Sequence, residues 1–333
     1  MRWRVSTLRW VSLTVAFVIL TFGGWVHRCW LGQFLPTLSC KYVLWTRAGD
    51  CYLWHIQRVL QNADFDELLP ELMFFFLLIL LLGKSWCGWI CPFGFCMDLL
   101  DAFRRRLRMG YVTFSDALNR QLAWIKWVML FIMLVVPLLC IEGCVLSEYR
   151  RDLNVPFCQL CPARYITPLF NDMWNQLAVS FRSGASVLMT VLGLAITGLF
   201  LVGALVKRRF WCQFCPMGLI VGLCRKLSLL KLKKDCDACT RCGICNTVCP
   251  MDIKEVHLER KRSDVTHQDC ILCMRCIEYC PEDHALRATF CGKTIYEASQ
   301  KGFFARERSR PSDTLEKSVD ATTASSSGND HAK

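Results

Sequence analysis

The chain has 333 residues, a mean hydropathy of +0.29 and 53% hydrophobic residues, a balance that is too apolar for an ordinary soluble protein. Its formal net charge of +12 would by itself be compatible with nucleic-acid binding. The basic residues lie beside apolar segments, however, so we interpret them as signals of membrane topology and expect no nucleic-acid partner. The 23 cysteines in so long a chain favour metal binding over a disulfide scaffold.

Four apolar segments predict an all-α membrane domain with four transmembrane helices. In chain order, these spans cover residues 10–30, 68–91, 122–141 and 186–206. The first segment could instead be a signal peptide, but its length and its flanking tryptophans favour a membrane anchor. Lys126 lies near the inner end of the third span, where its long side chain is expected to reach water. The semi-apolar stretch 155–170 is a candidate for a re-entrant element.

Lysine and arginine cluster at the start of the chain, in the loop 97–121 and after the fourth span. This asymmetry predicts a multi-pass protein of the bacterial inner membrane with both termini in the cytoplasm. Leucines followed by a late basic face predict an amphipathic helix on the membrane surface over residues 217–234. The expected parts are a membrane domain (1–216), this interfacial helix (217–234), an α+β ferredoxin-like domain (235–300) and a disordered tail (301–333).

Two identical cysteine runs dominate the last third of the chain. The first reads Cys239-x2-Cys242-x2-Cys245-x3-Cys249-Pro250, and the second repeats it 31 residues later as Cys270-x2-Cys273-x2-Cys276-x3-Cys280-Pro281. Bacterial ferredoxins use this spacing for two [4Fe–4S] clusters, and the fourth cysteine of each run ligates the other cluster. Zinc is the alternative, but it needs only paired cysteines and has no use for the third closely spaced thiol.

The ferredoxin rule predicts the ligands of both clusters. One cluster would be held by Cys239, Cys242, Cys245 and Cys280, and the other by Cys270, Cys273, Cys276 and Cys249. Cys236 precedes the first run and is an alternative ligand, but Cys239 completes the repeat.

A second set of cysteines follows the predicted spans. Cys87-x3-Cys91-Pro92 and Cys212-x2-Cys215-Pro216 stand at the cytoplasmic ends of the second and fourth spans, in the parallel contexts Trp-Cys and Cys-Pro-x-Gly. Their four thiols could hold a further cluster, form redox-active pairs or dock a partner, or they could be ordinary buried residues. Cys158-x2-Cys161-Pro162 falls on the outer side, as a disulfide, an intramembrane dithiol or part of the re-entrant element.

Other redox groups lack the residues that they would need. Only His27 of the six histidines lies near a span end, so no histidine pair can ligate a haem within the membrane. The sequence has no Cys-x2-Cys-His haem attachment site and no glycine-rich dinucleotide fingerprint. Iron–sulfur clusters are therefore the main electron carriers that we expect.

The four spans, the membrane Cys-Pro motifs and the twin cysteine runs together resemble the NapH-like membrane polyferredoxins. This family includes the ferredoxin-type membrane subunit of periplasmic nitrate reductase systems and the cluster-bearing half of the nitrous oxide reductase regulator. The resemblance covers roughly residues 70–290. The chain departs from the family in the two-residue gap between Cys212 and Cys215, in the extra Cys158/Cys161 pair, and in lacking the regulator's large outer flavin-binding domain.

The resemblance implies quinol oxidation or electron relay across the cytoplasmic membrane, alongside partner proteins. We therefore expect single electrons to pass through two cytoplasmic [4Fe–4S] clusters between quinone, or a quinol-linked membrane protein, and a redox partner. The chain would then be a carrier or a quinol-dehydrogenase subunit more than a stand-alone enzyme. The surplus of Cys-Pro thiols motivates an alternative, an assembly factor that reduces a metal or a thiol during biogenesis of a respiratory enzyme.

Overall fold

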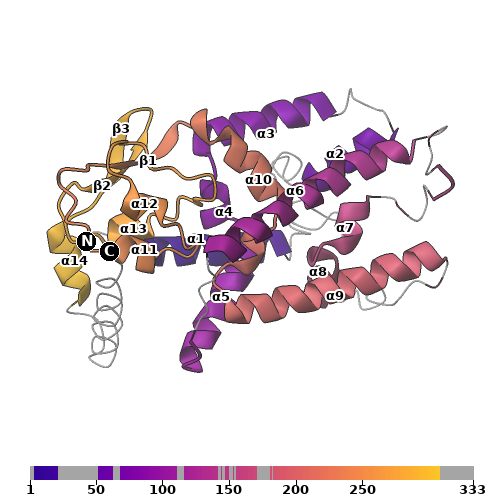
Figure 1. Ribbon diagram of the computed structural model, residues 1–333, viewed down its shortest axis with the longest axis horizontal. Coiled ribbons are helices and arrows are strands. Elements are labelled where there is room, and N and C mark those ends of the chain that lie inside the picture. Colours follow the sequence, from indigo (N-terminus) through magenta and orange to yellow (C-terminus); the bar gives the residue numbers. More distant parts are fainter. Residues whose placement is uncertain are drawn as a thin grey trace, which may run out of the picture.

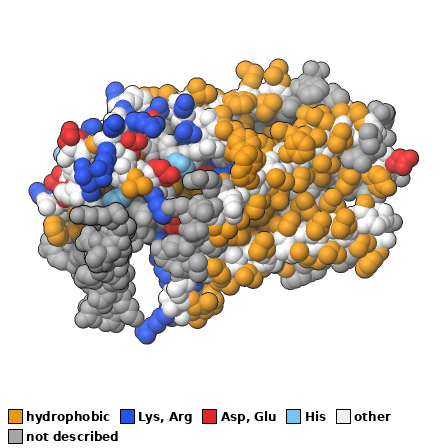
Figure 2. Space-filling model, in the orientation of Figure 1, with side chains coloured by type: hydrophobic (Ala, Val, Ile, Leu, Met, Phe, Trp, Pro, Cys, Tyr) orange, Lys and Arg blue, Asp and Glu red, His pale blue; other side chains and the backbone are white. Residues whose placement is uncertain are grey.

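The computed structural model describes residues 4–21, 52–62, 68–110, 116–141, 144, 147–149, 153, 155–170, 181 and 183–307. A helical part occupies one half of an elongated molecule, and a small α/β part occupies the other end (Figure 1). Figure 2 shows hydrophobic side chains over most of the helical half, whereas lysine, arginine and acidic side chains gather on the α/β end. Trp124, Phe131 and Val202 are each at least 60% exposed on the helical half. Large apolar side chains gathered in this way on a surface indicate contact with lipid.

Four apolar helices form the predicted membrane part. They are α1 (Val5–Thr21), α3 (Leu68–Leu82), α6 (Asp116–Leu139) and α9 (Gly184–Val206). Two segments, Gln121–Leu139 and Gly184–Val206, are long and apolar enough to cross a membrane, whereas the apolar runs Val5–Val18 and Leu72–Leu82 are shorter. Residues 22–30 of the first predicted span lie outside the described residues.

The second predicted span, residues 68–91, is not one helix. α3 ends at Leu82, Gly83 follows it with a φ of +56°, and the short helix α4 (Ser85–Trp89) comes next. A Cβ atom at Gly83 would lie 2.4 Å from Ser228 Oγ, so both conformation and space require glycine there. Pro92 then begins α5 (Pro92–Arg106), because proline fits the first turn of a helix.

The predicted re-entrant stretch consists of two short helices, α7 (Pro156–Leu160) and α8 (Ala163–Phe170). Every residue of α7 is buried, and this helix contacts α6 and α9. α2 (Tyr52–Asn62) packs along α6 (Figure 1). The Cys161–Pro162 junction separates α7 from α8, because proline removes a backbone donor and restricts the preceding residue.

The prediction of one amphipathic helix over residues 217–234 is wrong. α10 (Pro216–Leu223) is buried and contacts α6, and a 3₁₀ turn (Cys224–Lys226) and strand β1 (Leu230–Lys234) follow. The sequence Leu230-Lys-Leu-Lys-Lys alternates with a period of two, which suits a strand with its leucines turned inward. This stretch therefore joins the two parts from within the fold.

The α/β part is built on an antiparallel sheet of order β1-β2-β3, with β2 at Leu286–Phe290 and β3 at Lys293–Glu297. Leu232 pairs with Ala288 in its core. The remaining described helices are the single turns α11 (Ile244–Thr247), α12 (Glu255–Leu258) and α13 (Arg275–Glu278), and α14 (Gln300–Glu307). The expected disordered tail is thus helical up to Glu307, and residues 308–333 lie outside the described residues.

Candidate iron–sulfur sites

The sequence repeat is also a repeat of backbone conformation. α13 lies 31 residues after α11. Positive φ angles also recur at this spacing: Arg241 (61°) matches Leu272 (47°), and Gly243 (74°) matches Met274 (59°). Alternation of left-handed with ordinary residues turns successive N–H groups toward one point, which makes a concave site for an anionic group such as an iron–sulfur cluster. Each cysteine loop therefore has the backbone shape that a cluster requires.

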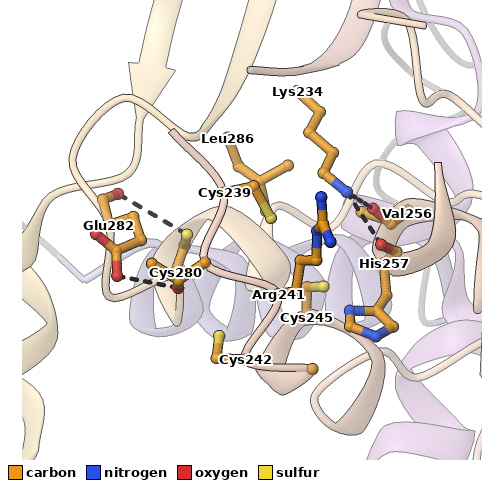
Figure 3. Close-up of a pocket in the computed structure, with 12 residues that line it drawn as sticks. Lys234, Cys239, Arg241, Cys242, Cys245, Val256, His257, Cys280, Glu282 and Leu286 are labelled. Carbon is orange, nitrogen blue, oxygen red and sulfur yellow. Dashed lines mark hydrogen bonds between the residues drawn. The ribbon is translucent and has the colours of Figure 1, made fainter. Parts of the chain in front are cut away.

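The first candidate site brings Cys280 to the first cysteine run (Figure 3). Cys239, Cys242, Cys245 and Cys280 line one cavity. Cys280 lies within electrostatic range of the other three thiols. Its Sγ also donates to the carbonyl oxygen of Glu282, with 3.8 Å between the two atoms. The fourth thiol thus comes from the opposite end of the repeat, as the ferredoxin rule predicts.

The second candidate site is the reciprocal arrangement. Cys249 lies in the same cavity as Cys270, Cys273 and Cys276. The same cavity contains apolar side chains, including those of Met251, Ile253 and Ile271. Cys276 lies within electrostatic range of the other three thiols of this site. The structure therefore brings the fourth cysteine of each run into the cavity of the other run, and Cys245 lines both cavities.

The chemistry of both sets fits a cubane cluster, whose four irons each take one thiolate. Among the described residues, no three His, Cys, Asp or Glu side chains lie close enough to hold a single metal ion. A tetrahedral zinc would need four ligand atoms within about 2.3 Å of one point. Burial raises the pKa of Cys249 and of Cys270 to about 12, and that of Cys280 to about 11. Iron binding must therefore displace protons from these thiols.

Lys234 is a buried lysine beside the first candidate site, and its position there was not predicted from the sequence. Lys234 Nζ donates to the carbonyl oxygens of Val256 and His257 at 3.0 Å and of Glu259 at 2.8 Å (Figure 3). Its charge lies within range of Cys245. Leucine and lysine alternate along β1 until its last residue, where a lysine stands at an inward-facing position. This break in the alternation was the signal in the sequence that could have identified it. A fixed cation beside the thiols would favour the reduced, more negative cluster.

The four membrane Cys-Pro thiols also converge. Each of the six possible pairs among them lies within electrostatic range. Cys87 lies in α4, Cys91 caps the N-terminus of α5, Cys212 lies in the 3₁₀ helix Phe210–Gln213, and Cys215 caps α10. Cys87 and Cys212 pack against the core of the α/β part, beside the second candidate site.

The remaining predicted cysteines lie elsewhere. Cys158 is buried in α7, and its Sγ accepts a hydrogen bond of 3.3 Å from Gln57 Nε2. Cys161 packs against the same hydrophobic cluster as Cys215. Cys236 is not among the residues that line the first cavity, and its Sγ points to the carbonyl oxygen of Arg262.

Polar contacts fix the α/β part on the membrane part. Lys126 Nζ pairs with Asp269 Oδ1 at 2.8 Å, so Lys126 does not simply reach water as predicted. Lys84 Nζ lies 3.6 Å from the same carboxylate and donates to the carbonyl oxygen of Gln268. Burial opposes ionisation of Asp269, but these two lysines outweigh it and lower the pKa of the carboxyl group. The two parts are thus joined by charged groups that sequence reasoning did not pair.

Comparison with known proteins agrees with this arrangement. A profile of a 4Fe-4S binding domain matches residues 72–110 and 189–235, and a 4Fe-4S dicluster domain matches residues 231–281. YccM of Escherichia coli, named as a candidate electron transport protein, is 28% identical over 84% of this chain and 72% of its own length. The ferredoxin-type protein NapH of Escherichia coli is 29% identical over 61% of each chain. No solved structure matches significantly.

An archaeal relative of similar extent is also known. An uncharacterised protein of Methanocaldococcus jannaschii is 27% identical over 73% of this chain and 87% of its own length. The fold and these matches define a membrane-associated iron–sulfur protein of electron transfer. More particularly, the likeness to NapH and YccM, together with the two 4Fe-4S domain matches, supports a NapH-like [4Fe–4S] polyferredoxin family.

Proposed function

We propose that the protein relays single electrons through two cytoplasmic [4Fe–4S] clusters between the quinone pool, or a quinol-linked membrane protein, and a redox partner. The observation that carries this proposal is the reciprocal exchange of Cys249 and Cys280 between the two sets of thiols. Each cluster, when bound, supplies a site that accepts and releases one electron. The chain's own residues hold the two sites in one compact part and fix that part to the membrane helices.

The cytoplasmic placement is supported by the distribution of charge. The basic turn Arg104-Arg105-Arg106 ends α5, and Lys207, Arg208 and Arg209 follow α9. Lys207 pairs with Asp252 and Arg208 donates to the carbonyl oxygen of Thr247, both in the α/β part, and Arg208 also lies 3.9 Å from Asp101 of α5. Arginine and lysine mark the cytoplasmic side of bacterial membrane proteins. The clusters would then lie where iron–sulfur centres are assembled and kept reduced.

A relay also requires that electrons reach the clusters from the membrane. Trp89 Nε1 donates a 3.0 Å hydrogen bond to the carbonyl oxygen of Leu272, inside the second cysteine loop. A Cβ atom at Gly88 would lie 2.3 Å from the carbonyl oxygen of Ile271, so the two backbones touch. The second candidate site therefore lies directly on the membrane part, in the position that a membrane donor or acceptor would use.

Anaerobic purification with iron, sulfide and zinc analysis tests the cluster assignment. We expect at least about eight irons and eight sulfides per chain, with an EPR spectrum of reduced cubanes. Zinc without sulfide would contradict it. Reduction of the clusters by a short-chain quinol in proteoliposomes tests the quinone link, and dithionite serves as the control reductant. Clusters that dithionite reduces but quinol does not would leave a protein partner as the membrane-side donor.

The orientation has its own test. Cys291 is exposed in the loop between β2 and β3. A membrane-impermeant maleimide should label Cys291 in inverted membrane vesicles and spare it in intact spheroplasts, with Cys291→Ser as the control for site. Labelling in intact spheroplasts would place the α/β part outside.

A further inference from the structure

Exposed basic side chains surround the opening of the first candidate site. They form, with one leucine, the basic rim, which consists of Arg241, Leu258, Arg260, Lys261 and Arg262. We propose that the basic rim docks a soluble redox protein with an acidic face, which exchanges single electrons with the first cluster. This inference rests on the proposed electron-transfer function and adds the kind of partner and the place where it binds.

Cys242 brings the first site to the protein surface. Among the eight predicted cluster ligands it is the exposed one, whereas Cys273 and Cys280 are buried and the other five are partly buried. Arg241 precedes it with a φ of 61°, and both residues line the first cavity (Figure 3). Because electron transfer slows steeply with distance, a soluble partner would exchange electrons at this ligand.

The second site is covered by the membrane part and is not open in this way. Gly88 packs against the backbone of Ile271, and Trp89 donates to the carbonyl oxygen of Leu272, so α4 covers the second cysteine loop. Cys245 lines both cavities, which makes the two sites direct neighbours. An electron that enters from the membrane part can therefore cross from the second site to the first and leave at the exposed end.

The segment 260–262 is held in a fixed conformation beside the first site. Glu259 Oε1 accepts hydrogen bonds from the N–H groups of Arg260 and Lys261 at 3.0 Å and of Arg262 at 3.3 Å. The carbonyl oxygen of Glu259 accepts from the buried Lys234 at 2.8 Å. The Arg262 side chain remains 82% exposed, although its Nε lies 3.4 Å from Glu259 Oε2. A loop that is already ordered loses less conformational freedom when a partner binds.

Acidic side chains near the first site are engaged within the α/β part. Asp235 Oδ1 accepts hydrogen bonds from the N–H groups of residues 237 and 238. Glu282 accepts a 3.0 Å hydrogen bond from the Thr240 hydroxyl, and Glu255 Oε1 lies 3.8 Å from His267 Nε2. These carboxylates therefore do little to neutralise the basic rim.

The cations of the basic rim leave the surface around Cys242 positive. Within the part of the chain that the structure describes, Arg241, Arg260 and Lys261 form no ion pair, and Asp237 is an exposed acid of the same loop as Arg241. Three cations thus stand against one carboxylate. Attraction between such a surface and an acidic face speeds encounter and orients the two proteins.

Leu258 supplies the apolar contact of the basic rim. It ends α12 and is 60% exposed, next to the fixed segment. Protein interfaces combine an apolar centre with a polar surround, and one exposed leucine among cations suits a small, transient electron-transfer complex. In that complex one electron moves between the first cluster and a one-electron centre of the partner, and no bond is made or broken.

Electron transfer to two probe proteins of opposite charge tests the docking surface. The full-length protein is reduced with dithionite, freed of the reductant and mixed with a soluble c-type cytochrome, either net acidic or net basic, whose ferric haem takes up one electron. We expect the rate with the acidic cytochrome to fall as salt is added, because salt screens the attraction, and the rate with the basic one not to fall. Equal salt dependence of the two rates would overturn the proposal.

Charge variants locate the surface. Arg260→Gln, Lys261→Gln should lower the rate with the acidic cytochrome at low salt about tenfold and flatten its salt dependence. The matched control is Lys226→Gln, Lys293→Gln, which removes two exposed lysines elsewhere on the α/β side of the molecule and should leave both rates unchanged. Leu258→Ala should lower the rate at every salt concentration and leave its salt dependence as it was. Equal losses in the two charge variants would contradict the basic rim.

Cross-linking gives a readout that does not depend on electron transfer. A carbodiimide joins a lysine amine to a carboxylate only where the two are in contact, and mass spectrometry identifies the lysine. With the acidic cytochrome we expect cross-links at Lys261, and cross-links confined to Lys226 or Lys293 would overturn the proposed surface. Failure of the proposed function is a different result: the reduced protein would then hold no iron or pass no electron to either cytochrome.

Discussion

Asp269 of the second cysteine loop accepts hydrogen bonds of 2.8 and 3.0 Å from Lys126 of α6, a helix that is long and apolar enough to cross the membrane. Lys126 and Lys84 are buried lysines that share this one carboxylate. Removal of a partner from a buried ion pair is far more costly than loss of a surface pair, because the remaining charge stays buried. This pairing therefore predicts which substitutions loosen the two parts of the molecule.

Asp269→Asn should destabilise the junction by about 3 kcal/mol, because it leaves two buried ammonium groups without a counter-charge. The measurement is hydrogen exchange of the backbone amides in β1 and the second cysteine loop. Asp264→Asn is the matched control, since Asp264 forms an exposed pair with Lys231 at 3.5 Å. Such a surface pair contributes at most about 1 kcal/mol. Equal effects of the two substitutions would contradict the role assigned to Asp269.

Gly88→Ala should weaken the contact between the membrane part and the α/β part at a second point. The added Cβ atom would lie 2.3 Å from the carbonyl oxygen of Ile271, which is backbone and cannot rotate away. We expect a loss of about 2 kcal/mol or more in the free energy of unfolding, measured by thermal denaturation in detergent. Gly198→Ala is the control, because nothing lies within 4 Å of the added atom, and it should be neutral or slightly stabilising. A Gly88→Ala variant as stable as the control would show that the contact is not maintained.

Substitution of the fourth cysteine of each run should show which of the two ferredoxin-type clusters that cysteine ligates. Cys249→Ser should remove the EPR signal of the cluster held by the second run, and Cys280→Ser that of the first, because each fourth thiol serves the other set. Each variant should lose about four irons. Cys236→Ser is the control and should lose none, since its thiol lies outside the first cavity. Loss of the cluster of the same run in each case would contradict the exchange.

The iron-free protein should show an unusual dependence on alkaline pH. Burial raises the pKa of Cys249 and Cys270 to about 12, above the ordinary value of about 8.5. Their alkylation rates should keep rising about tenfold per pH unit beyond pH 9, because only the thiolate reacts. Because the folded protein keeps these thiols protonated, they contribute to the free energy of unfolding. This contribution is complete below about pH 8.5 and is lost as the pH rises toward 12. Iodoacetamide labelling followed by mass spectrometry measures the rates, and a plateau at pH 9 would contradict the burial of these thiols.

Much of the α/β part could be predicted because its information is local. The two cysteine runs fix both the loops and the repeat, and the structure extends this to matching backbone conformations at Arg241 and Leu272. The exchange of Cys249 and Cys280 is also a consequence of the known spacing rule. The convergence of the four membrane thiols was an open expectation, since it depends on how two helix ends meet.

The failures occurred where tertiary contacts decide the structure. Residues 230–234 have basic residues that suit a membrane surface, yet pairing with β2 makes them a strand. Lys126 could have reached water, but a carboxylate 143 residues away in sequence receives it. Arg209 gave only a topology signal, whereas its buried position is set by Asp98 and by the backbone of Cys87. Pairings over such separations leave no pattern in one sequence.

The direct hydrogen bond from the Leu229 N–H to the carbonyl oxygen of Leu80, at 2.8 Å, joins the residue before β1 to the end of the apolar helix α3. A soluble ferredoxin must diffuse to its membrane donor, and such encounters between charged proteins slow as salt is added. Here the candidate cluster sites are held on the membrane part of the same chain. Under the proposed relay, reduction by an uncharged quinol should therefore be insensitive to ionic strength, and only the exchange with a soluble redox partner should respond to salt.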